Sequence, residues 1–158
     1  MNRNRSTTLR LVALIAALAA LALAGCGGGD VKESNAYVDS VNLAQTRFAA
    51  SFERLARDIT SASTPAQDRK TLRSIEATID ATVADLRKIA PPEKVKAQHD
   101  QLVEAIAQYG EAINTAGQKL GGSAEQATAA EARLAADTAK TSTQVNAAIA
   151  AINQKLRE

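Results

Sequence analysis

Apolar side chains recur along most of this chain at alternating spacings of three and four residues. The first run comprises Val38, Val41, Gln45, Phe48, Phe52, Leu55 and Ile59. Three further runs extend from Leu72 to Ile89, from Val95 to Leu120 and from Leu134 to Leu156. A strand would need apolar residues at every second position, whereas a mean spacing near 3.5 is typical of long helices packed along one apolar line, the seam. The pattern predicts an all-α protein.

Proline and glycine residues divide these runs into four predicted helices. The breaks are Ser61 to Thr64 before Pro65, Ala90-Pro91-Pro92, and Gly121-Gly122-Ser123. Thr64 and Ser123 are each followed three residues later by glutamine, which is the arrangement of a capping box. We predict helices over residues 35–61, 65–90, 92–120 and 124–157. Because short connections favour antiparallel neighbours, the predicted fold is an up-down-up-down antiparallel four-helix bundle over residues 35–158.

The chain opens with a basic segment that leads into a short apolar run. Arg3, Arg5 and Arg10 occur without any acidic residue, and residues 11–24 are all Leu, Ala, Val or Ile. A basic segment followed by an apolar segment of this length is typical of a secretory signal, whereas a spanning helix needs about 20 apolar residues. We therefore expect residues 1–25 to form a signal helix that is cleaved from the mature protein.

The apolar run ends in Leu23-Ala24-Gly25-Cys26, which resembles the lipobox of bacterial lipoproteins. In that family a diacylglycerol, with acyl chains such as palmitate, is attached to the cysteine, and the signal peptidase cuts just before it. The resemblance implies that Cys26 is the lipidated first residue, anchored at the extracytoplasmic face of the cell membrane. The alternative is a secreted protein with an unmodified cysteine near its cleavage point. The glycines at positions 27–29 predict a flexible tether over residues 26–34.

Composition argues against most kinds of chemistry. The chain has one Cys and one His, so it lacks the ligands of a Cys-based zinc or iron-sulfur site and the paired histidine motifs of a di-iron bundle. We expect no metal, no cofactor, no catalytic residue and no enzymatic activity. Of the 19 basic residues, three belong to the signal, which leaves 16 against 17 acidic residues. The two signs alternate, so no nucleic-acid partner is predicted.

Polar residues interrupt three of the seams at positions that the predicted fold brings to one height. Folding the helices about their connections places Gln45, Thr82 and His99 in a single layer. Buried polar layers fix the register and number of helices in bundles, and this interpretation needs no ligand. The same layer is also compatible with a small-ligand site or a pH-sensitive switch at His99.

Two other features of the sequence lead to packing predictions. Gly110, Gly117 and Gly121 lie on one face of the third predicted helix, where they favour close approach to the alanine-rich fourth helix or, alternatively, a loosened helix end. Tyr37 lies off the first seam, so the pattern predicts an exposed side chain near the anchor, within reach of lipid headgroups.

The segment Asp85 to Pro92, followed by His99, Leu102 and Val103, resembles small extracytoplasmic helical proteins of actinobacteria. That resemblance implies an outward-facing bundle and no particular reaction. We therefore expect a non-enzymatic lipoprotein that the lipid on Cys26 holds on the membrane and that binds or scaffolds a cell-envelope protein. The alternative is a small-ligand or pH-sensing carrier that uses the polar layer.

Overall fold

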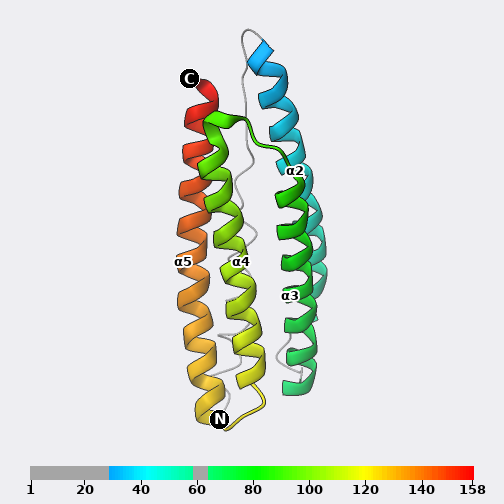
Figure 1. Cartoon of the computed structure of the whole chain (residues 1–158). Coiled ribbons are helices and arrows are strands. Elements are labelled where there is room, and N and C mark those ends of the chain that lie inside the picture. The colour runs from blue at the N-terminus through cyan, green and yellow to red at the C-terminus, as the bar shows by residue number, and fades with distance from the viewer. Residues whose placement is uncertain (1–28, 59–63) are drawn as a thin grey trace.

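The computed structural model describes residues 29–58 and 64–158, and this part of the chain is helical apart from its connections. Four long helices lie side by side (Figure 1). They are α2 (Gly29–Ala56), α3 (Pro65–Lys88), α4 (Lys96–Lys119) and α5 (Ala124–Arg157), with a short 3-10 helix, η1 (Glu93–Val95), before α4. The predicted all-α class with four long helices is confirmed. The expected signal helix, Cys26 and Ile59 lie outside the described residues.

Both predicted capping boxes are present at the starts of α3 and α5. The Thr64 hydroxyl accepts the backbone N–H of Gln67, and the Gln67 side chain accepts the backbone N–H of Thr64. Ser123 and Gln126 make the same reciprocal pair at α5. Each box satisfies two backbone groups that a helix start leaves without intrahelical partners. These local contacts explain why the two helices begin within one residue of a break in the sequence.

Several helix boundaries differ from the prediction: among them, α2 ends at Ala56 rather than at residue 61, and α4 begins at Lys96, after η1, rather than at residue 92. α2 begins at Gly29, so residues 29–34, expected to belong to the flexible tether, are helical and Ser34 is buried. Val31, Ser34 and Val38 continue the spacing of three and four toward the N-terminus. α3 ends at Lys88 and Ile89 is extended, because the prolines that follow disfavour helical backbone.

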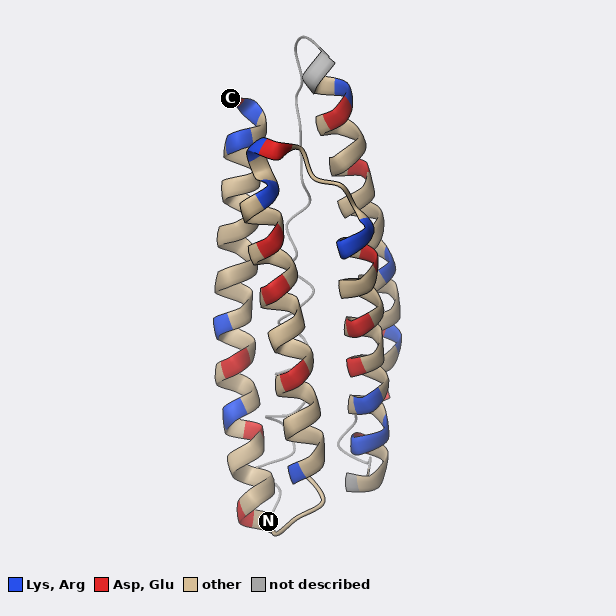
Figure 2. Cartoon of the chain, viewed as in Figure 1, with Lys and Arg blue, Asp and Glu red and all other residues tan. Residues whose placement is uncertain are grey.

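The core follows the predicted seams closely. The buried positions include Val41, Phe48, Ile75, Ile79, Leu102, Ile113, Val145 and Ile152. Each aliphatic or aromatic side chain removed from water in this way stabilises the fold by roughly 1.5–3 kcal/mol. The buried stripe is wider than the seam, since Tyr37, Val83 and Val103 are also buried. Charged residues of both signs are distributed over the outside of the helices (Figure 2).

The two interior glycines of α4 face α3 rather than α5, so the prediction that they line the approach to the fourth helix was wrong. A Cβ atom on Gly110 would lie 3.1 Å from Ile79 Cγ2, and one on Gly117 would lie 3.8 Å from Leu72 Cβ. Gly121 follows α4 and lies against the Arg69 side chain of α3. Small residues therefore bring α4 close to α3.

We expect opposite outcomes when alanine replaces these two glycines. Gly117→Ala is expected to stabilise the fold by about 0.5–1 kcal/mol, because alanine is the better helix former and the new methyl group has ordinary contact distances. Gly110→Ala gains the same propensity, but its methyl group presses on fully buried Ile79, and overpacking costs about 1–3 kcal/mol. Urea unfolding of both variants measures the difference. Equal stabilisation by both would contradict close packing at Gly110.

Candidate functional site

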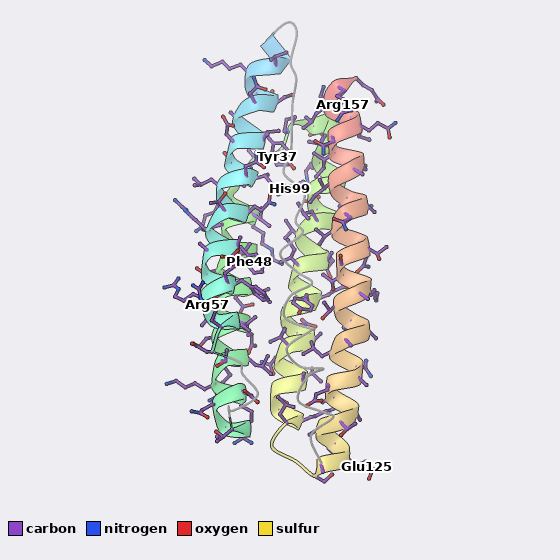
Figure 3. All side chains as sticks on the ribbon, turned by 180° about the vertical axis from the view of Figure 1, so that it is seen from behind. Tyr37, Phe48, Arg57, His99, Glu125 and Arg157 are labelled. Atoms are coloured by element: carbon purple, nitrogen blue, oxygen red, sulfur yellow. The ribbon has the colours of Figure 1, made fainter. Side chains whose placement is uncertain are left out.

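His99 is held between three helices near the α3–α4 connection. It lies in the first turn of α4, and its imidazole is 3 % exposed. Tyr37 reaches it from α2, and the Leu86 carbonyl reaches it from the last turn of α3. Tyr37 and His99 lie next to one another in the side-chain view (Figure 3). Their rings meet edge to face, with centroids 5.6 Å apart.

The two hydrogen bonds of His99 require a single tautomer of the neutral ring. Nε2 lies 3.1 Å from the Leu86 carbonyl oxygen, which can only accept, so Nε2 carries the proton and donates. Nδ1 is then the acceptor, and the Tyr37 hydroxyl donates to it over 3.2 Å. Leu86 O also accepts the backbone N–H of Ile89. His99 therefore supplies a second donor to one of the last carbonyls of α3, and fastens α2 to that point.

Burial keeps both rings of this pair neutral. Desolvation lowers the pKa of His99 below its ordinary value of 6.5, and the nearby charge of Lys96 lowers it further. The hydrogen bond to Leu86 and the charge of Asp100 act in the opposite direction but are outweighed. Desolvation likewise raises the pKa of Tyr37 to about 12. Protonation of Nδ1 would bury a positive charge and force the Tyr37 hydroxyl to give up its bond as a donor. The hydrogen bond between Tyr37 and His99 therefore requires that both side chains are neutral.

A hollow of about 350 Å³ lies directly beside His99. Its floor is apolar apart from the imidazole and consists of Ile89, Pro91, His99 and Val103. Four exposed charged residues surround the floor, namely Arg87, Lys96, Asp100 and Glu104. Lys96 and Asp100 form an ion pair at 3.3 Å along α4, and Glu104 accepts the Gln108 amide at 2.9 Å. An apolar floor with a few polar groups is the usual form of a small-molecule site.

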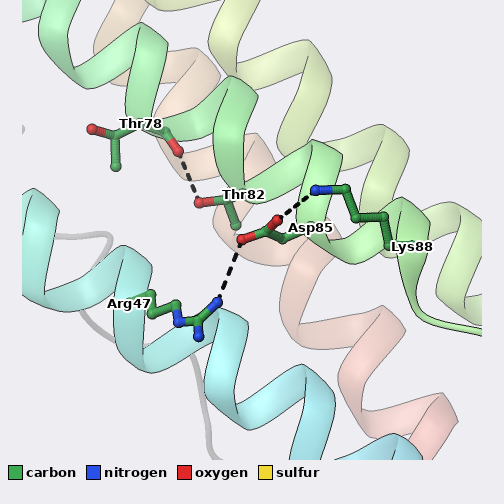
Figure 4. A network of polar contacts seen from close by, with 5 residues as sticks. All are labelled: Arg47, Thr78, Thr82, Asp85 and Lys88. Atoms are coloured by element: carbon green, nitrogen blue, oxygen red, sulfur yellow. Dashed lines mark hydrogen bonds and ion pairs between the residues drawn. The ribbon is translucent and has the colours of Figure 1, made fainter.

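The predicted layer of Gln45, Thr82 and His99 does not correspond to these contacts. The Thr82 hydroxyl donates to the Thr78 carbonyl of its own helix at 2.8 Å (Figure 4). Gln45 is half-buried on α2. The charged contact in this region joins α2 to α3 through Arg47 and Asp85, 3.9 Å apart, and Asp85 also pairs with Lys88 at 3.1 Å.

The helical register explains where Thr82 lies. Gly110 faces Ile79 and Gly117 faces Leu72, so residue numbers rise along α4 as they fall along α3. At this register Thr82 is level with Ala107, about 12 Å along the helix axis from His99 at 1.5 Å per residue. The prediction placed the turning point at Pro91-Pro92, whereas the chain reverses at η1, which follows the prolines.

Tyr37 is the site residue that the sequence pattern missed. It is 2 % exposed, so the expected exposed position near the anchor was wrong. Tyr37 immediately precedes the seam residue Val38, and a helix that packs against two neighbours buries such a flanking position as well. The signal that could have identified it is chemical, since a buried histidine needs a partner for each ring nitrogen.

A second buried polar contact joins α4 to α5 in the middle of the bundle. Thr138 Oγ1 donates to the Leu134 carbonyl at 2.7 Å, so the Tyr109 hydroxyl, 3.3 Å away, is the donor to Thr138. Burial raises the pKa of Tyr109 to about 12. All partners in this contact are satisfied, and we assign it to helix packing.

Residues 29–58 and 64–158 contain no cluster of three or more His, Cys, Asp or Glu side chains that could hold a metal ion. None of the described helices is long and apolar enough to cross a bilayer. In the comparisons with known proteins, no protein-family model, no curated protein and no solved structure matches the chain.

Proposed function

We propose that this chain is a lipid-anchored extracytoplasmic lipoprotein that binds or scaffolds a protein of the cell envelope, with no catalytic step of its own. Its helices form an up-down-up-down antiparallel bundle in this proposal. The two paired positions of α3 and α4 support the antiparallel direction of those helices. The Arg47–Asp85 contact places α2 beside α3, and the Tyr109–Thr138 contact places α5 beside α4.

The observation that carries the proposal is the position of the lipobox relative to the first described helix. Cys26 precedes the start of α2 at Gly29 by three residues. Three residues span at most about 10 Å. A lipid on Cys26 therefore holds the bundle close to the headgroups, with the α3–α4 connection and the C-terminus at the anchored end (Figure 1). A partner would have to reach the bundle at the membrane surface.

The exposed helix faces favour a protein partner over a nucleic acid. Figure 2 shows acidic residues along the middle of α4 and basic residues toward its ends, and no continuous basic stripe follows any helix in that view. Nucleic-acid binding depends on such a stripe. The resemblance to small actinobacterial helical lipoproteins agrees with a location outside the cytoplasm.

Photo-crosslinking in intact cells tests the binding function. A photoreactive side chain at Leu43, which is 52 % exposed on α2, and another at exposed Ala136 on α5 sample two different helices. We expect a discrete product with another envelope protein from at least one position. The same positions in a Cys26→Ser background are the control, and there the product should disappear. Recovery of the bundle alone from both positions would contradict the scaffold function.

A second candidate function is a small-ligand or pH-sensing carrier, and one specific observation favours it. His99 is buried, it connects α2 with α3, and it forms part of the floor of a hollow large enough for a small molecule. The predicted layer of Gln45 and Thr82 no longer contributes to this candidate. Its site is the Tyr37–His99 pair together with the hollow.

A further inference from the structure

We propose that the hollow beside His99 binds a small zwitterion with an apolar body, the chemistry of an apolar amino acid. The inference rests on the second candidate function and specifies its ligand class. Two features support this proposal. The hollow is lined by two opposite charges that do not pair with one another, and its floor is apolar.

Arg87 and Glu104 are the two charges that a ligand could bridge. At the register of α3 and α4, Arg87 is level with Leu102, so it lies within about 3 Å of Glu104 along the helix axes. Opposite charges at one height across two neighbouring helices commonly form an ion pair. The described chain contains no such pair between these two residues, and both line the hollow instead.

The other two rim charges compensate one another. Lys96 and Asp100 are paired at 3.3 Å, which leaves Arg87 as the free cation and Glu104, with only the Gln108 amide as partner, as the available anion. A ligand carboxylate would accept from the Arg87 guanidinium, which is suited to carboxylates, while a ligand ammonium would donate to Glu104. A simple anion or cation would satisfy only one of the two.

The floor determines the rest of the ligand. Ile89, Pro91 and Val103 offer apolar contact, whereas His99 is 3 % exposed and its ring nitrogens are already bonded, so His99 contributes no hydrogen bond to the ligand and almost no contact surface. A branched aliphatic side chain fits these neighbours. At 350 Å³ the hollow is near the lower end for ligand sites, and it is bordered by exposed side chains. We therefore expect weak binding, with a Kd of about 1–10 mM for a ligand of nine heavy atoms.

A zwitterion and two analogues, each of which lacks one of its charges, test the ligand class. L-leucine is titrated into the mature, isotope-labelled protein in an uncharged detergent, in parallel with leucinamide, which lacks the carboxylate, and 4-methylpentanoate, which lacks the ammonium group. NMR shifts of residues 87–104 report binding. We expect saturable shifts with leucine and at least about tenfold weaker binding of either analogue, since each loses one charged hydrogen bond.

Variants of the rim provide the second arm. Arg87→Gln should weaken leucine but not leucinamide, and Glu104→Gln should weaken leucine but not 4-methylpentanoate. Arg73→Gln, at an exposed arginine of α3 outside the hollow, is the matched control and should bind like wild type. Absence of leucine shifts at residues 87–104, equal binding of all three probes, or equal weakening by Arg73→Gln would each overturn the proposal. None of these results bears on the lipid anchor, so failure of the ligand proposal can be distinguished from failure of the lipoprotein proposal.

Discussion

Replacing Cys26 with serine is expected to remove the lipid from the protein altogether. Serine lacks the sulfur that forms the thioether, so the diacylglycerol cannot be attached and cleavage before residue 26 should fail with it. Each buried CH₂ group stabilises membrane attachment by about 0.8 kcal/mol, which makes two long acyl chains a firm anchor. Intact-mass measurement of the membrane fraction should therefore find wild type beginning at Cys26 with added lipid mass, and the variant without it.

A matched variant separates loss of the thiol from disturbance of the signal region. Gly28→Ser changes a neighbouring residue but keeps Cys26, so it should carry the same lipid mass as wild type. If native wild-type protein keeps residues 1–25, or begins at residue 26 with an unmodified thiol, the lipoprotein proposal is wrong. A lipid of equal mass on Cys26→Ser would also contradict the proposal, because this chain has no second cysteine to which the lipid could be attached.

Local features of the sequence predicted most of the fold. The seams identified the four helices because burial of one helix face repeats every three or four residues, whatever the neighbours are. The starts of α3 and α5 were predicted because a capping box involves only residues within one turn. The start of α2 was missed because the glycines before it were given more weight than the apolar spacing that continues through Val31 and Ser34.

The site depends on geometry between helices, which the pattern does not contain. A small error in the turning point between α3 and α4 moves every cross-helix pair, and it placed Thr82 at the height of His99 although the two are about two turns apart. The partner of a buried polar atom is likewise a property of the packed bundle. Sequence reasoning identified His99 as an interruption of the seam, but Tyr37 and the Leu86 carbonyl follow only from the way α2 and α3 pack around it.

Replacing His99 with leucine is expected to destabilise the bundle by about 2–3 kcal/mol. The change leaves the buried Tyr37 hydroxyl without its acceptor, and an unsatisfied buried polar group costs about 1–3 kcal/mol. It also removes a donor from Leu86 O, which keeps only the Ile89 N–H. Urea unfolding followed by circular dichroism measures the loss. A polar residue that served only to fix register would give the opposite sign, because leucine fills such a position more favourably.

Tyr37→Phe completes a double-mutant cycle for the pair. Alone it should cost about 1–2 kcal/mol, since His99 Nδ1 loses its donor. In the double variant no unpaired hydroxyl or imidazole remains, so the combined loss should be smaller than the sum of the two single losses by at least about 1 kcal/mol. Additive losses would show that the hydrogen bond contributes nothing to stability.

The same variants separate the contribution of His99 to acid sensitivity. Because the pKa of His99 is lower in the folded protein than its ordinary 6.5, the unfolded chain takes up a proton first as the pH falls. The stabilisation linked to neutral His99 is therefore present above about pH 6.5 and is lost as the pH falls toward the folded pKa. Glu131 acts in the opposite direction, since burial and then the charge of Asp68 raise its pKa. Because both proteins contain Glu131, its contribution cancels in the difference between their free energies of unfolding. That difference between wild type and His99→Leu should shrink between about pH 7 and 5. A constant difference over that interval would mean that protonation of His99 has no effect on how α2 is held.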